Sequence, residues 1–312
     1  MSNEVNAVEL PVSEKYAFVD QDSLHGDEVV RKNIGYWEDA ARRFYKNKVA
    51  MFFLVVLLAL IVMSVLGPII ADKDYITISG KTKNLSPDST YWFGTDSMGR
   101  DLFSRAWVGL RASLMVAAVA SVVQLVIGCL YGAIMATMGG IVDEIMMRFV
   151  EVLSCIPNLI LVTLLLVVFG NGYLQLLFAL SFSSWTGTAR LVRGQLLKLK
   201  ESEYVLASKA LGSSNAHRIV KHLLPNTVGL LILEMAQAIP SVIFSESSLS
   251  FLGIGLMPPN FSLGSMLAQG QTAMAFYPYQ LVVPCVLLSL LVLSFNVIGD
   301  ALRDALDPQL RN

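Results

Sequence analysis

Residues 50–70 read AMFFLVVLLALIVMSVLGPII, an apolar run that contains no charged side chain. A bilayer core about 30 Å thick needs about 20 consecutive apolar residues in an α-helix, so this run is long enough to cross it. Several further apolar runs follow. So many long apolar runs in one chain are not explained by the buried helices of a globular protein. The sequence therefore predicts an all-α integral membrane protein with six transmembrane helices, at about 50–70, 112–138, 152–170, 172–189, 227–245 and 277–299.

The composition also favours lipid over a large soluble core. Of 312 residues, 54% are hydrophobic and only 15% are charged, whereas a soluble domain averages about 25% charged residues. The net charge of −1 gives no basic excess, which argues against nucleic acid as a partner. Cys129, Cys155 and Cys285 are scattered through apolar runs, so they predict neither a disulfide framework nor a metal site.

Lysine and arginine residues near the span ends predict the orientation in the membrane. Basic residues cluster just before the first span and again in the loop 190–226, so both segments are expected in the cytoplasm. With six spans, the N- and C-termini then both lie in the cytoplasm. The loop 71–111 is expected outside, where its acidic residues balance its basic ones.

The part of the chain before the first span divides into two. Residues 1–35 are polar and show no apolar periodicity, which predicts a flexible head. Aromatic and apolar residues recur at helical spacing in residues 36–49, with basic residues among them, which predicts an amphipathic helix at the membrane interface. Residues 50–312 then form the six-helix transmembrane domain.

Within the loop 190–226, the pattern predicts a protruding helical hairpin. A helix-forming run begins at Glu203 and ends at Gly212, a helix-stop residue. The following polar residues can cap a second short helix, which stops before Pro225. Small side chains on the first helix would let another protein approach its backbone closely, which suits docking in a groove. The alternative is a solvated, charged loop.

This hairpin resembles the EAA signature of ABC-importer permeases. The matching positions are Glu203, Ala207, Ser208, Gly212, Ile219, Leu224 and Pro225, and Ala210 and His217 belong to the same hairpin. Ser208 stands where the family usually has alanine. The resemblance implies that the hairpin is the coupling helix, which seats in a cleft of a cytoplasmic ATPase subunit; the spacing alone predicts only a hairpin.

Three further stretches resemble the oligopeptide, dipeptide and nickel permeases within this class. They are the segment 93–105 before the second span, the segment 248–255 after the fifth, and the C-terminal segment 299–308. The matching residues of the first are Gly94, Thr95, Asp96, Gly99, Arg100, Asp101, Ser104 and Arg105. The polar head resembles the C-type subunit of the permease pair, and the likeness extends from about residue 36 onward.

The segment 93–105 has two interpretations. Its acidic and basic residues could neutralise one another in a well-folded elbow at the membrane surface. The alternative is contact with a substrate-binding partner.

Polar and proline residues inside the spans are candidates for a translocation path. Glu234 lies about two turns into the fifth span, with Gln237 three residues on, and an ionisable group at that depth is a functional candidate. The alternative is a glutamate near the inner interface that snorkels or pairs with a basic group. Pro157 and Pro240 are expected to kink their helices, and Asn158 could bind backbone groups freed by the first kink.

The sequence contains no G-x-x-x-x-G-K-[ST] phosphate loop, no H-E-x-x-H motif and no nucleophile with an adjacent base. We therefore expect no catalytic site, no metal site and no cofactor in this chain. The resemblance implies that two cytoplasmic ATPase subunits bind ATP and Mg. It also implies a homologous second permease subunit and an extracytoplasmic peptide-binding protein, in the plasma membrane of a prokaryote.

The expected function is therefore that of a permease subunit in an importer of oligopeptides or dipeptides. Within the same class, the cargo could instead be nickel or another small solute. A more distant alternative is a secondary transporter that works without ATP, for which Glu234 is the one candidate carboxylate at mid-membrane.

Overall fold

The computed structural model describes residues 35–218, 221, 223–256 and 258–306. Contacts divide the chain into two compact units, Met1–Asp39 and Ala40–Asn312, and the helix bundle belongs to the second. Regular structure in the described residues is helical, apart from one isolated antiparallel bridge between Thr95 and Asp101. The predicted head, residues 1–35, lies outside the described residues except for Gly35.

The predicted interfacial helix and the first span meet at Asn47. Helix α2 is Tyr36–Lys46 and helix α3 is Lys48–Ala71. The Asn47 side chain accepts hydrogen bonds from the backbone N–H groups of Val49 and Ala50, both at 3.1 Å, so it caps α3. The predicted boundary at residue 49 was therefore late, since Lys48 and Val49 already belong to α3.

Helix α4, Leu102–Met138, has 37 residues and contacts α3 and several later helices. It begins ten residues earlier than the predicted span, so residues 102–111 of the expected outer loop 71–111 are helical. The Asp101 side chain caps α4 by accepting a hydrogen bond from the Ser104 backbone N–H at 2.8 Å. Leu110, within the added residues, is fully buried, so the first turns of α4 belong to the core.

The predicted third span is divided between two helices. Helix α5, Gly140–Cys155, and helix α6, Asn158–Phe169, meet at an angle of 88°. The kink expected at Pro157 is confirmed, and it is a complete break. A proline disfavours helical geometry in the preceding residue, and Ile156 is indeed extended, with φ −83° and ψ 123°. The helical segment before the break begins at Gly140, well ahead of the predicted start at residue 152.

The remaining helices follow in order. They are α7 (Tyr173–Lys200), α8 (Glu203–Ala210), α9 (Asn215–Arg218), α10 (Leu224–Phe251), α11 (Leu263–Ala273) and α12 (Tyr279–Leu306). Helix α7 extends into the predicted loop 190–226, and the Val192 and Leu196 side chains of this extension are buried. Helix α10 continues as a single helix through Pro240. Helix α11, which was not predicted, begins with a capping box between Ser262 and Ser265.

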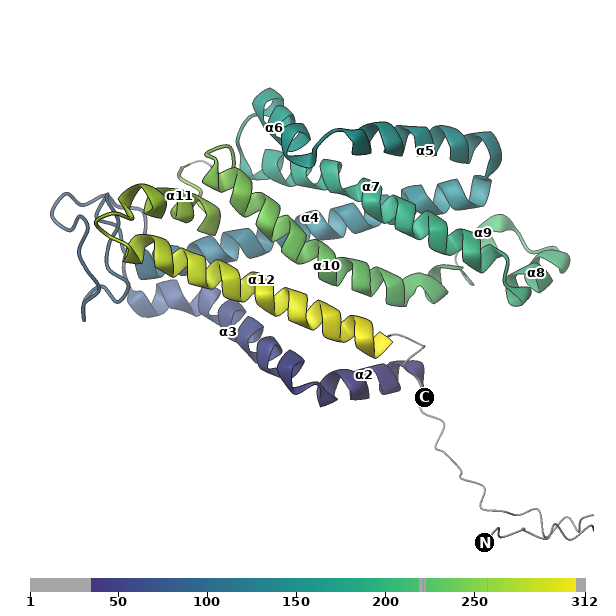
Figure 1. Ribbon diagram of the computed structural model, residues 1–312, viewed down its shortest axis with the longest axis horizontal. Coiled ribbons are helices and arrows are strands. Elements are labelled where there is room, and N and C mark those ends of the chain that lie inside the picture. Colours follow the sequence, from purple (N-terminus) through teal and green to yellow (C-terminus); the bar gives the residue numbers. More distant parts are fainter. Residues whose placement is uncertain (1–34, 219–220, 222, 257, 307–312) are drawn as a thin grey trace, which may run out of the picture. The chain divides into compact units, whose positions relative to one another are not determined.

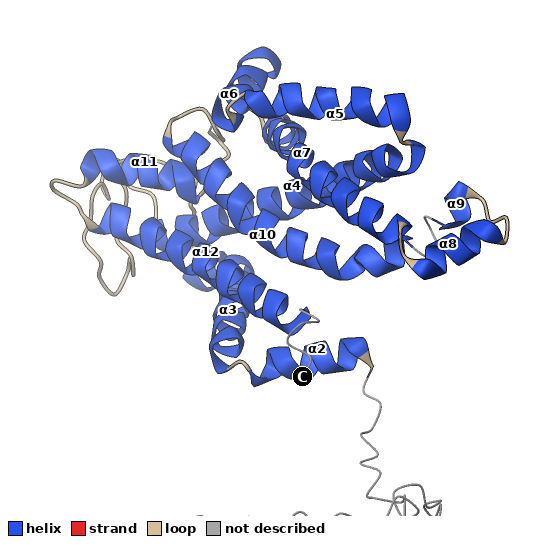
Figure 2. Ribbon diagram, turned by 45° about the vertical axis from the view of Figure 1, so that its right-hand side comes forward, coloured by secondary structure: helices blue, strands red, loops and turns tan. Residues whose placement is uncertain are grey.

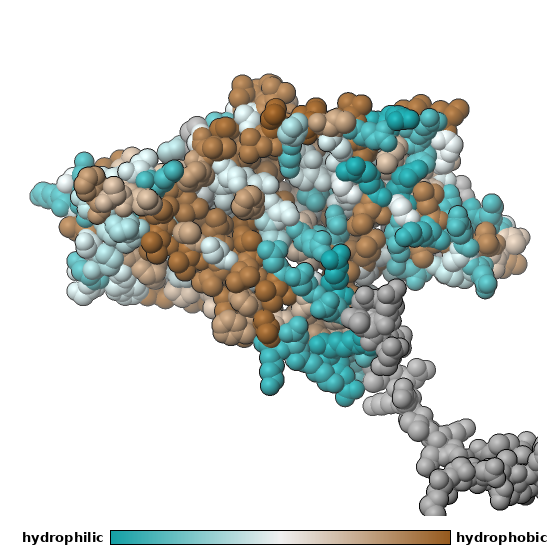
Figure 3. All heavy atoms as spheres, in the orientation of Figure 1, coloured by the Kyte–Doolittle hydropathy of each residue, from teal (hydrophilic) through white to brown (hydrophobic). Residues whose placement is uncertain are grey.

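Within the part of the chain that the structure describes, four helices are long and apolar enough to cross a membrane, namely α3, α4, α10 and α12, or up to five if the bent pair α5–α6 forms one span. The predicted fourth span lies in α7, which is not among them. Hydrophobic surface gathers over the middle of the bundle (Figure 3). The loop 72–101 lies with α11 at one end of this unit, and α8 and α9 lie at the opposite end (Figures 1 and 2).

Candidate functional site

The hairpin of α8 and α9 is attached to the ends of two long helices. Val205 of α8 is buried in a hydrophobic cluster with Ala136 of α4 and Leu196 of α7, together with Leu223. The Lys200 ammonium donates a hydrogen bond to the Ala136 carbonyl oxygen at 2.6 Å, near the C-terminal end of α4, where a cation is favoured by the helix dipole. A force applied to the hairpin would therefore reach α4 and α7 through packed side chains.

Gly212 forms the turn between the two short helices. Its φ is +80°, in the left-handed region that glycine adopts without strain. Tyr204, Leu206 and Leu211 are exposed on the hairpin, and Leu211 is 88% exposed. An apolar surface at such a tip is typical of a docking surface.

Other residues of the EAA resemblance lie around this turn. Glu203 is in the first turn of α8, where a carboxylate is favoured by the helix dipole. The His217 backbone N–H donates to Ser214 Oγ at 3.2 Å. Pro225 stands in the first turn of α10, where a missing N–H costs nothing. Ile219 lies outside the described residues.

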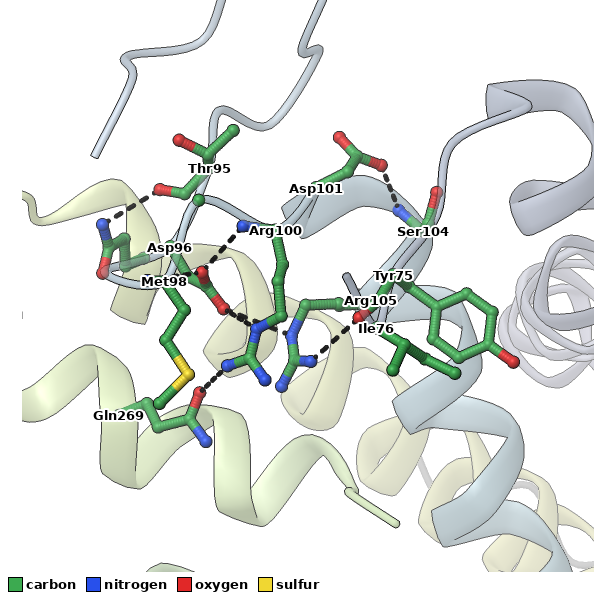
Figure 4. Close-up of polar contacts among 12 residues, drawn as sticks. Tyr75, Ile76, Thr95, Asp96, Met98, Arg100, Asp101, Ser104, Arg105 and Gln269 are labelled. Carbon is green, nitrogen blue, oxygen red and sulfur yellow. Dashed lines mark hydrogen bonds and ion pairs between the residues drawn. The ribbon is translucent and has the colours of Figure 1, made fainter. Parts of the chain in front are cut away.

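At the opposite end of the bundle, Asp96 organises the segment 93–105 (Figure 4). Its Oδ1 atom accepts the backbone N–H groups of Met98 at 2.9 Å and Arg100 at 3.0 Å. Its Oδ2 atom accepts Arg100 Nε at 2.8 Å and lies 3.5 Å from Arg105 Nε. Three of the four charged residues expected to pair therefore do so, whereas Asp101 caps α4 instead.

Arg105 ties this segment to the core. It is only 2% exposed, its Nη1 donates to the Tyr75 carbonyl oxygen at 3.1 Å, and its guanidinium carbon lies 4.1 Å from the centre of the Phe261 ring. Arg100 Nη2 donates to Gln269 Oε1 of α11 at 3.3 Å (Figure 4). The loop, α4 and α11 are thus held together by one buried charge network.

A polar cavity of about 400 Å³ lies among α4, α6, α7 and α10. Three of the five candidate path residues line it, namely Asn158, Glu234 and Gln237. Pro157 and Pro240 do not. Thr188 Oγ1 of α7 donates to Glu234 Oε1 at 2.9 Å, so the carboxylate is held by a neighbouring helix. Gln124 of α4 also lines the cavity, and sequence reasoning missed it because an uncharged polar residue in an apolar run is a weak signal.

Two glycines bring α4 and α7 into backbone contact beside this cavity. A Cβ atom at Gly128 would lie 2.6 Å from Thr188 Cβ, and one at Gly132 would lie 2.5 Å from the Ala189 carbonyl oxygen. Small residues four apart in an apolar helix allow such close packing in membranes. The G-x-x-x-G pattern at 128–132 was the signal that the sequence analysis missed.

Comparison with known proteins identifies the class. Residues 124–312 match the family model "binding-protein-dependent transport system inner membrane component", and residues 35–87 match "N-terminal TM domain of oligopeptide transport permease C". The chain belongs to this family of ABC-importer permeases and is a multi-pass membrane protein. Within the family, it is an OppC/DppC-like, C-type permease of the oligopeptide, dipeptide and nickel group.

Two relatives and one solved structure illustrate the likeness. The oligopeptide transport system permease protein OppC of Bacillus subtilis (strain 168) is 40% identical, over 91% of this chain and 93% of its own length. The dipeptide transport system permease protein DppC of the same strain is 45% identical, over 91% and 89%. A chain of the inward-facing MetNI methionine ABC transporter matches with a TM-score of 0.54 at 21% identity, covering 63% of this chain and 94% of that chain, which shows a shared fold.

Proposed function

We propose that this chain is the transmembrane permease subunit of an ATP-driven peptide importer and forms half of its translocation path. A homologous permease subunit forms the other half. The support is that relatives at 40% and 45% identity, over most of both chains, are named oligopeptide and dipeptide transport permeases. The polar cavity, which is lined by residues of four helices, is the part of this chain that faces the path.

The proposed topology is that of a type I importer permease with six spans: α3, α4, the broken pair α5–α6, α7, α10 and α12. Helix α7 is the least apolar, yet it packs along α4 and also contacts α6 and α10. Its Ser183, Ser184 and Thr186 line the cavity, so these polar groups need not meet lipid. Both termini and the α8–α9 hairpin then lie in the cytoplasm of a prokaryotic cell.

The observation that carries the proposed mechanism is the packing of Val205 of the hairpin against α4 and α7, at the place where Lys200 of α7 is bonded to Ala136 of α4. In this mechanism, two cytoplasmic ATPase subunits bind ATP and Mg, and this chain has no ATPase site of its own. Their closing and opening moves the docked hairpin, and the stiff connection transmits that movement to the helices around the cavity. An extracytoplasmic binding protein delivers the peptide at the end where the loop 72–101 lies.

Uptake of labelled dipeptides and pentapeptides, with nickel as a parallel solute, tests this function in cells that lack only this chain. We expect peptide uptake to fall and to return when the chain is restored. The peptide length that is taken up faster then shows whether the cargo is dipeptides or oligopeptides. If peptides enter normally while nickel uptake falls, the permease assignment holds and the peptide cargo is wrong. If no solute is affected, the proposed function is overturned.

ATP dependence separates the importer from a secondary transporter. The full complex is reconstituted in vesicles with peptide and binding protein on one side and ATP on the ATPase side. We expect no accumulation without ATP. Accumulation driven by this chain alone, with an ion gradient and no ATPase subunits, would establish the alternative.

A further inference from the structure

The polar cavity offers several hydrogen-bond acceptors to a ligand. Three of its serines use their hydroxyl protons within their own helices. Ser183 Oγ donates to the Leu180 carbonyl oxygen at 3.1 Å, and Ser245 Oγ to the Ser241 carbonyl oxygen at 2.9 Å. Ser241 Oγ donates in the same way to the residue four positions earlier, at 2.9 Å. A hydroxyl whose proton is used in this way has only its lone pairs left for a ligand.

The two strongest acceptors of the cavity lie on different helices. Glu234 of α10 accepts the hydrogen bond from the Thr188 hydroxyl on Oε1, and its Oε2 atom has no donor among the described residues. Gln124 of α4 is only 7% exposed, and its Oε1 atom has no hydrogen-bond partner among the described residues. A buried acceptor without a donor is unfavourable, so a ligand that brought an N–H group to Gln124 Oε1 would be stabilised there. The donors of the cavity wall include the Asn158 and Gln237 amides and the exposed Arg190.

We propose that this cavity binds the primary ammonium group of the peptide cargo, with Glu234 as its counter-ion and Gln124 Oε1 as a second acceptor. An ammonium group carries three donors and no acceptor, which matches these acceptors. A free N-terminus is common to all unmodified peptides, so a site for it recognises cargo independently of side chains. A lysine side chain of the peptide carries the same group and is the second source of a primary ammonium group. This inference rests on the proposed function.

The test uses the complete importer in vesicles and compares two tripeptides, trialanine and its N-acetyl derivative. For wild type, uptake of each peptide is measured with the same binding protein and saturating ATP. We expect Glu234→Gln to lower the uptake rate of trialanine by about tenfold, because a charge-assisted hydrogen bond is lost, and to leave the rate of the acetylated peptide unchanged. The ratio of the two rates removes any preference that the binding protein itself has.

Control variants separate recognition from folding. Glu234→Asp keeps the charge and should retain the wild-type ratio of trialanine uptake to acetyl-trialanine uptake. Gln124→Leu should lower this ratio by a smaller factor than Glu234→Gln does. Glu144→Gln makes the same chemical change at an exposed position of α5 and should change nothing. Copurification of all subunits verifies the assembly of each variant.

A third peptide, acetylated at its N-terminus and containing lysine, distinguishes the two sources of the ammonium group. If its uptake falls in Glu234→Gln, the site accepts a lysine ammonium as well; if its uptake is unchanged, the site is specific for the N-terminus. The proposal is overturned if Glu234→Gln affects trialanine and acetyl-trialanine equally, or neither. A wild-type complex that imports no peptide with ATP would instead refute the proposed function, which keeps the two failures distinct.

Discussion

The hydroxyl oxygens of Ser208 and Ser213 lie 2.8 Å apart across the turn of the α8–α9 hairpin. Ser213 Oγ also donates to the Ser208 carbonyl oxygen at 2.7 Å, and the Ser213 backbone N–H reaches the same carbonyl at 3.2 Å. Ser208, which stands where the family resemblance leads one to expect alanine, therefore adds a side-chain link to a turn that backbone bonds already close.

Removing this link should loosen the turn without abolishing it. Ser208→Ala loses one side-chain hydrogen bond, worth about 0.5–1.5 kcal/mol, and should speed amide exchange at residues 211–213 up to about tenfold. Ser213→Ala loses both the hydroxyl pair and the bond to the Ser208 carbonyl, so its exchange should be faster still. Hydrogen exchange of the purified complex measures both variants. Equal exchange in wild type and Ser213→Ala would show that the side chains do not stabilise the turn.

A β-branched residue at Gly212 should uncouple transport from ATP hydrolysis. A Cβ atom there would meet nothing within 4 Å, so the whole effect of Gly212→Val comes from the backbone, which is at φ +80°. We expect ATP-dependent peptide uptake to fall at least about tenfold, since the strain of about 1–3 kcal/mol changes the turn that positions the hairpin.

Gly212→Asn is the matched control, because asparagine tolerates the left-handed region better than other residues. It should retain most of the uptake, and both variants should copurify with the second permease subunit. Normal uptake by Gly212→Val would contradict the coupling role of the hairpin.

The sequence predicted the apolar helices and the hairpin because each depends on local patterns. The first turns of α4 were missed because they contain Arg105, whose burial depends on Asp96 and on the distant Tyr75 carbonyl group. No local hydropathy value contains that information. Helix α11 was missed because it is short and its N-terminal signal is a pair of serines, Ser262 and Ser265.

Only part of the candidate path was predicted from the sequence, and the rest was missed for a similar reason. Glu234 attracted attention because a charge in an apolar run is conspicuous, and it does line the cavity. Gln124 and Thr188 are uncharged, and their relation to Glu234 arises from the packing of three helices. The sequence of a single span cannot show which polar groups of other spans converge on it.

Neutralising Asp96 should strongly destabilise the end of the bundle where the loop 72–101 lies. Asp96 is 4% exposed and faces two guanidinium groups, so Asp96→Asn leaves Arg100 and Arg105 without their anion. Breaking a buried ion pair from one side costs about 3–5 kcal/mol. We expect a clear drop in the thermal unfolding temperature of the purified complex in detergent.

Asp74→Asn provides the control for this variant, because Asp74 is a carboxylate on the same loop outside the buried network. It should unfold near the wild-type temperature. An unfolding temperature for Asp96→Asn equal to that of Asp74→Asn would mean that the network contributes little to stability.

Adding one methyl group at Gly132 should separate α4 from α7. The new Cβ atom would lie 2.5 Å from the Ala189 carbonyl oxygen, a backbone atom that cannot rotate away, so α7 has to shift. Overpacking of this kind costs about 1–3 kcal/mol, which should lower the unfolding temperature. Because Thr188 precedes Ala189 and holds Glu234, Gly132→Ala should also lower peptide uptake.

Gly194→Ala is the comparison that isolates the cause, because a Cβ atom at Gly194 of α7 would meet nothing within 4 Å. Alanine favours a helix over glycine by about 1 kcal/mol, so this variant should be as stable as wild type or more so, with normal uptake. If both alanine variants behave alike, the close approach of α4 and α7 is not required. If Gly132→Ala alone loses stability and uptake, the backbone contact between α4 and α7 is what holds Thr188 against Glu234.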